Sequence, residues 1–61
     1  MARHSNYYKE ALKIFIREYG DMRIGEMAVK RDLIIVAEIF NKKPVDVASD
    51  VLRERLKMNG L

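Results

Sequence analysis

The fold of this chain is decided by the stretch Phe40-Asn41-Lys42-Lys43-Pro44, which separates two helical patterns. Asn is one of the few residues that adopt the left-handed conformation closing a helix. Pro suits the first turn of a helix, because its missing N–H would be unpaired there. Lys42 and Lys43 therefore form a tight basic turn, and the sequence predicts a helix on each side of it.

After the turn, apolar residues recur at helical spacing and predict a helix over about residues 44–58. The inward-facing positions are Val47, Ala48, Val51, Leu52 and Leu56. The opposite face is polar, and it begins with Asp46, Ser49 and Asp50.

Before the turn, the spacing predicts a helix over about residues 26–41, with a buried stripe formed by Val29, Leu33, Val36, Ala37 and Phe40. Additional isoleucines extend the apolar surface around most of this helix. A protein of this size has too few other helices to cover such a surface. We therefore expect a homodimer, with an interface formed by Leu33, Ile34, Ile35 and Ile39.

The N-terminal part of the chain predicts a further helix over about residues 6–19, with Ser5 or Asn6 as its cap. Its apolar stripe, spaced four, three and four residues apart, is Tyr8, Leu12, Phe15 and Tyr19. Gly20 is suited to the left-handed position that ends a helix. Residues 1–4 are expected to be a flexible tail.

The segment 22–27 allows two interpretations. Asp21 can cap a longer second helix that contains Gly25, at a cost of roughly 1 kcal/mol relative to Ala. Alternatively, Met22, Ile24 and Glu26 point one way and the residues between them the other, as in a short strand. The helix fits slightly better, and the strand remains an open alternative.

The length of 61 residues allows a single domain, and the sequence predicts an all-α fold of three helices. So short a chain buries only about 60% of its unfolded surface, so its core is marginal. With no cysteine, and His4 as the single histidine, neither a disulfide nor a metal site is expected, and no cofactor is indicated. No apolar run reaches the length of a membrane span, and no signal peptide is recognisable, so we expect a cytoplasmic protein without membrane contact.

Catalysis is not expected from this sequence. There is no cysteine nucleophile, and neither Ser5 nor Ser49 has a histidine nearby in the sequence. No glycine-rich phosphate loop is present, and carboxylate pairs such as Asp46 and Asp50 lie on a polar helix face. We therefore expect no enzymatic activity and no small-molecule substrate.

Basic residues are the main candidates for a binding site. The net charge is +3 with a pI near 9.5, which permits an anionic partner. The side chains placed to neutralise phosphates are Arg23, Lys30, Arg31, Lys42 and Lys43. An ordinary solvated surface explains the same residues, with the two lysines of the turn favourable at the negative end of the preceding helix.

The segment 37–57 resembles the two-helix half of ribbon-helix-helix repressors. The matching features are an Ala four residues before the turn residue, Ala37 and Asn41, and the later apolar positions Val51, Leu52 and Leu56. The same Ala37 and Asn41, followed by Val47, also resemble a helix-turn-helix unit. The first resemblance implies a strand from each subunit that reads the major groove. Only 22–27 is available for it, with Arg23 as its base-reading side chain.

These observations lead us to expect a small homodimeric DNA-binding protein, a transcriptional regulator that grips phosphates through the basic turn. Two features of the predicted helix 44–58 oppose base reading, because Asp46 and Asp50 would face a polyanion. The alternative is a helical protein–protein interaction module, or a self-associating adaptor, that binds no nucleic acid.

Overall fold

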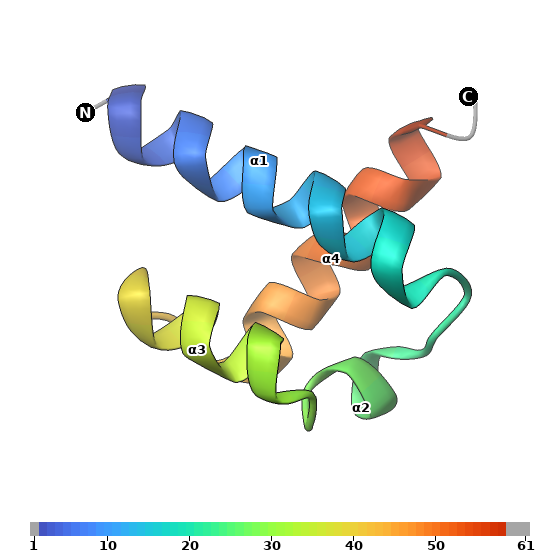
Figure 1. Cartoon of the computed structure of the whole chain (residues 1–61). Coiled ribbons are helices and arrows are strands. Elements are labelled where there is room, and N and C mark those ends of the chain that lie inside the picture. Colours follow the sequence, from blue (N-terminus) through green and yellow to red (C-terminus); the bar gives the residue numbers. More distant parts are fainter. Residues whose placement is uncertain (1, 59–61) are drawn as a thin grey trace.

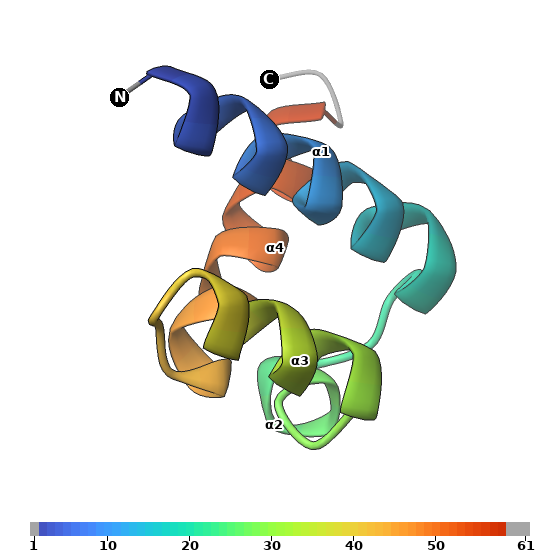
Figure 2. The same ribbon diagram turned by 60° about the vertical axis from the view of Figure 1, so that its left-hand side comes forward.

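The computed structural model describes residues 2–58, with side chains from Asn6 onward. Within this range the chain forms four helices and no strand, and the helices are α1 (Ala2–Tyr19), α2 (Ile24–Met27), α3 (Arg31–Ile39) and α4 (Pro44–Met58). The expected all-α class is confirmed. Helix α4 packs against α1, α2 and α3, and α1 and α3 run in opposite directions (Figure 1 and Figure 2).

The core lies where α4 meets the other helices. Three of the four residues of the expected α1 stripe are buried, and Tyr8 is half-buried. The buried residues are Leu12, Phe15, Tyr19, Met27, Leu33, Ala37, Val47, Ala48 and Val51. Each large apolar side chain among them contributes roughly 1.5–3 kcal/mol when fully buried. Every helix therefore contributes to one shared core.

The two predicted left-handed helix ends are confirmed. Gly20 has a φ of 61° after α1, and Asn41 has a φ of 57° after α3. The Lys42 N–H donates to the Ala37 carbonyl at 2.8 Å, which closes the last turn of α3. Pro44 begins α4, as its fixed φ and missing N–H favour.

The single helix predicted over 26–41 is wrong, because the chain forms α2 and α3 instead. The backbone leaves the helical region at Lys30, which is extended with φ −76° and ψ 135°. Met27 and Leu33 are both fully buried. On one continuous helix, residues six apart would point about 120° away from each other. The break at 28–30 allows both side chains to reach the same core.

The strand considered for 22–27 is also wrong. Arg23 is extended, with φ −84° and ψ 164°, but it directly precedes α2, which occupies Ile24–Met27. The Glu26 side chain accepts a 3.0 Å hydrogen bond from the Arg23 backbone N–H. A carboxylate three residues into a helix is a common way to satisfy this donor. The alternation that suggested a strand over 22–27 therefore belongs to the start of a helix.

The predicted start of the first helix is wrong as well. Helix α1 includes residues 2–4, which were expected to be a flexible tail, and Met1 lies outside the described residues. Neither Ser5 nor Asn6 is therefore the cap of α1. Ser and Asn cost less than about 1 kcal/mol inside a helix, so local propensity did not prevent the additional turn.

Three predicted environments differ from the observed ones. Val29, expected in the buried stripe, lies in the break after α2 and is 72% exposed. Leu56, expected to face inward, is 54% exposed near the end of α4. Leu33, assigned to the dimer interface, is fully buried in the core of its own chain and has no surface to offer a partner.

Candidate functional site

The five predicted phosphate-binding residues lie in two groups at opposite ends of α3. Arg23 and Lys30 immediately precede α2 and α3, and Arg31 is the first residue of α3. Lys42 and Lys43 lie in the turn after α3. All five are exposed. A helix of nine residues spans about 13 Å, so the structure does not gather them into one patch.

One lysine of the basic turn contacts α1. The Nζ atom of Lys42 lies 4.9 Å from the centroid of the Tyr8 ring, within the range of a cation–π interaction. The same ring meets Phe40 edge to face, with centroids 5.1 Å apart. Lys42 is thus held beside α1.

The polar face of α4 is partly occupied by contacts within the chain. Asp50 accepts a hydrogen bond from the Tyr8 hydroxyl and a weaker one from Arg53 at 3.5 Å. Asp46, one turn earlier, is exposed. The carboxylate of Asp50 therefore connects α4 to α1.

Exposed apolar side chains lie on flanks of α1 and α3. The flanks are identified by Glu18 and Asp32, which line a common cleft at one end of the two helices. Ile14 lies four residues before Glu18, and Ile35 lies three residues after Asp32, so each shares a flank with its carboxylate. We call this surface, extended below, the α1–α3 seam.

The seam consists of Tyr7, Ile14, Ile35 and Ile39. Tyr7 lies two turns before Ile14, and Ile39 lies one turn after Ile35. Their exposed fractions are 67%, 56%, 49% and 68%, respectively. Four such side chains expose on the order of 400 Å² of apolar surface, comparable to the largest patches on monomeric proteins. Of the predicted dimer interface, Ile35 and Ile39 belong to the seam, and Ile34 is 37% exposed on an adjacent flank.

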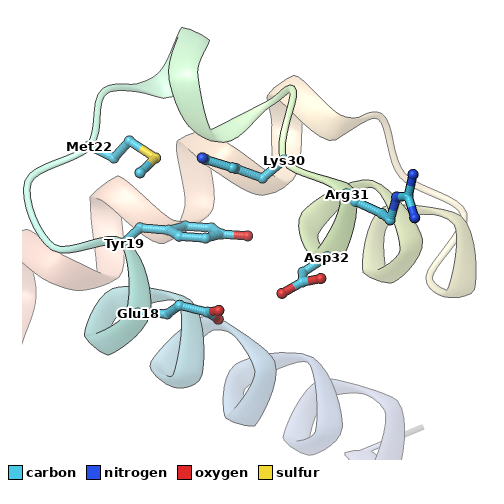
Figure 3. A pocket seen from close by; sticks show the side chains of 6 residues that line it. All are labelled: Glu18, Tyr19, Met22, Lys30, Arg31 and Asp32. Atoms are coloured by element: carbon cyan, nitrogen blue, oxygen red, sulfur yellow. The ribbon is translucent and has the colours of Figure 1, made fainter.

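A cleft of about 270 Å³ opens at one end of the seam, between the C-terminal end of α1 and the N-terminal end of α3 (Figure 3). Its lining residues are Glu18, Tyr19, Met22, Lys30, Arg31 and Asp32. The two carboxylates and the two cations cancel in formal charge. The N-terminal end of α3 adds a partial positive charge.

Tyr19 forms one wall of this cleft. Its side chain is 9% exposed and stacks on Phe15, with ring centroids 5.1 Å apart. Its hydroxyl is buried and makes no hydrogen bond of normal length and angle among the described residues, although the backbone N–H of Leu33 lies close enough to act on it. Burial raises the pKa of Tyr19, the carboxylates of Asp32 and Glu18 raise it further, and the backbone of Leu33 lowers it. The hydroxyl therefore keeps its proton at neutral pH.

Sequence reasoning missed the cleft and one important arginine. Arg55 donates hydrogen bonds to the carbonyl oxygens of Gly20 and Met22, and so ties α4 to the connection between α1 and α2. The sequence indicates only that Arg55 is favourable near the C-terminal end of a helix. The partner carbonyls lie 33 and 35 residues away, and no local pattern signals contacts of that separation.

No helix in the part of the chain that the structure describes is both long enough and apolar enough to cross a membrane. Within residues 2–58 there is likewise no cluster of three or more His, Cys, Asp or Glu residues suited to a metal ion. No protein-family model matches the chain, and neither a curated protein nor a solved structure matches it.

Proposed function

We propose that this protein is a self-associating helical module, in which two copies meet through the α1–α3 seam. The observation that carries the proposal is the exposure of four large apolar side chains on two antiparallel helices, Tyr7 and Ile14 on α1 and Ile35 and Ile39 on α3. Removing apolar surface from water stabilises an assembly by about 25 cal/mol per Å². A marginal core is one of the conditions under which small domains oligomerise.

A second copy suits this surface because the seam is formed by two antiparallel helices. A two-fold dimer uses the same patch on both subunits. Two such pairs, laid face to face, place four helices around a shared apolar layer, as in a helix bundle. A standard interface buries about 800 Å² per partner, of which the four seam side chains supply about half. Polar neighbours such as Glu10 and Glu38 form the rim.

Sedimentation equilibrium from micromolar to millimolar concentration tests the proposal. Wild type is expected to form a dimer, and Ile35→Asp is expected to weaken it by at least about 100-fold, because each dimer would bury two unpaired carboxylates. Ile35 is 49% exposed, so the substitution leaves the monomer folded. Circular dichroism checks that it does.

Val45→Asp is the matched control, because Val45 has a similar exposure of 48% but lies on α4 outside the seam. It is expected to leave the dimer intact. The proposal is refuted if wild type stays monomeric at every concentration. It is also refuted if Val45→Asp dissociates the dimer and Ile35→Asp does not.

DNA binding is a second candidate, supported by the exposure of all five predicted basic side chains. Its contacts would be to phosphates, because the exposed carboxylate of Asp46 at the start of α4 opposes base reading. A salt titration with duplex DNA tests it. Binding must weaken as salt rises, and Lys42→Ala with Lys43→Ala must lower the salt dependence.

The control for that experiment is Lys9→Ala with Lys13→Ala, which removes the same charge from the exposed surface of α1. Equal weakening by both pairs would indicate an unspecific effect of net charge. No detectable binding at low salt would eliminate this candidate and leave self-association as the function.

A further inference from the structure

Helix α4 has a second stripe of residues besides the face that it buries in the core. The stripe repeats every four, three and four residues along the helix, and it consists of Val45, Ser49, Leu52 and Leu56. This is the spacing with which one helix packs along another in a coiled coil. At about 100° per residue, the stripe lies roughly a third of a turn around α4 from the buried face. We call it the α4 stripe.

The rest of the chain covers the α4 stripe only in part. Val45 is 48% exposed and Leu56 is 54% exposed, whereas Ser49 and Leu52 are half-buried. None of the four residues belongs to the core. The stripe therefore offers apolar surface to a partner, although its three apolar side chains expose less of it than the four of the seam.

Charged residues along one edge of the α4 stripe indicate which partner fits. Asp46 and Arg53 each come directly after an apolar residue of the stripe, so both lie on the same edge of it. Both side chains are exposed, and Arg53 approaches Asp50 of its own chain only to 3.5 Å. This edge is acidic near the start of α4 and basic further along, so a copy of the same helix in the opposite direction complements it.

A two-fold axis through the middle of the α4 stripe brings these charges together. For helices that run in opposite directions, such an axis places the same edge of both helices side by side. Asp46 lies about 4.5 residues before the middle of the stripe and Arg53 about 2.5 residues after it, so the two differ in height by about 3 Å between copies. An arginine side chain spans this offset. Copies that run in the same direction would bring opposite edges together and separate these two residues.

We infer that the α4 stripe is a second self-association surface, on which α4 of another copy packs in the opposite direction and Asp46 of each copy pairs with Arg53 of the other. A chain with two different two-fold contacts assembles into a tetramer, or into a longer array where the axes do not close. The α4 contact does not depend on the seam, whereas assembly beyond a dimer rests on the proposed self-association. Because the stripe exposes less apolar surface, its contact is the weaker one and forms at higher concentration.

Sedimentation equilibrium at millimolar concentration tests the α4 contact. Wild type is expected to pass from a dimer to a tetramer or larger species. Val45→Asp is expected to remain a dimer, because the second contact would bury two carboxylates without partners. Ile35→Asp is the matched control, since it blocks the seam and should form only the weaker dimer through α4. Combining both substitutions should give a monomer, and circular dichroism checks that each variant is folded.

An exchange of the two charges tests the direction in which the helices pack. Asp46→Arg alone, or Arg53→Asp alone, places like charges opposite each other twice in the contact, and each should weaken the second association step about tenfold. The double variant restores opposite charges, and its affinity should return to within about threefold of wild type. A side chain that acted only within its own chain would not give this rescue.

The inference is overturned if Val45→Asp associates at millimolar concentration as far as wild type does. It is also overturned if the double charge variant associates no better than the two single variants. A failure of the seam gives a different result, in which Ile35→Asp associates as far as wild type and Val45→Asp is a monomer.

Discussion

The hydroxyl of Tyr8 on α1 donates a 2.5 Å hydrogen bond to the carboxylate of Asp50 on α4, 42 residues later in the chain. Burial raises the pKa of Tyr8, and the hydrogen bond and negative charge of Asp50 raise it further. The bond fixes the first half of α1 against α4, close to the basic turn. It also removes Asp50 from the set of side chains available to a partner.

Replacing Tyr8 by Phe is expected to lower the free energy of unfolding by about 1–2 kcal/mol, because half-buried Asp50 loses a donor. Urea denaturation measures the change. Tyr7→Phe is the control, because Tyr7 is 67% exposed, and its effect should stay within about 0.5 kcal/mol. Equal effects of the two substitutions would mean that the Tyr8–Asp50 bond contributes nothing.

Stability is expected to fall in alkaline solution. The pKa values of Tyr8 and Tyr19 are both raised above the ordinary 10.0, so the folded state holds these protons more tightly than the unfolded state. Their contribution is complete below about pH 10 and is lost as the pH rises toward the folded values, by up to about 1.4 kcal/mol per pH unit for each group. Unfolding midpoints of wild type and Tyr8→Phe should be measured from pH 8 upward, about two units below the ordinary pKa of tyrosine. The midpoint of Tyr8→Phe should fall less with rising pH than the midpoint of wild type.

Arg55→Ala is expected to destabilise the protein by about 1–2 kcal/mol, since the carbonyls of Gly20 and Met22 lose their donor. Hydrogen exchange should increase in the connection between α1 and α2 before it increases in the core. Arg53→Ala removes an arginine that is 69% exposed, and its effect should be small. Unchanged exchange around Met22 in Arg55→Ala would contradict the assigned role.

Replacement by Ala is expected to have opposite effects on stability at two of the glycines. Gly20 has a φ of 61°, so Gly20→Ala forces a side chain into the left-handed region and costs about 1–2 kcal/mol. Gly25 lies inside α2, and a methyl group added there would meet only open space, so Gly25→Ala should stabilise by about 0.5–1 kcal/mol. Thermal unfolding of the two variants compares them directly, and a stabilising Gly20→Ala would mean that α1 does not end as described.

The parts of the fold that the sequence predicts correctly are those with a local physical cause. Gly20, Asn41 and Pro44 each have a backbone preference that acts within one turn, and they define the ends of α1 and α3 and the start of α4. The α1 stripe is equally local, since its residues share one helix face.

The break at 28–30 has no such cause, because Ala28, Val29 and Lys30 are compatible with a continuous helix. The break exists because Met27 and Leu33 must both reach the same core. Tertiary packing imposes this requirement, and the local sequence does not. The cleft could not be predicted for a similar reason. Glu18 and Tyr19 lie at the end of α1, whereas Lys30 and Asp32 lie at the start of α3. Only the folded arrangement of the two helices brings these residues together.

The position of α4 has a consequence for how the chain acquires its structure. Helix α4 packs against each of the other three helices and is the last of them to leave the ribosome. Until residues 44–58 emerge, the apolar faces of α1, α2 and α3 have no common surface to cover them. Most domains fold as units, and here α4 completes the unit, so folding during synthesis should be abrupt once α4 has emerged rather than gradual.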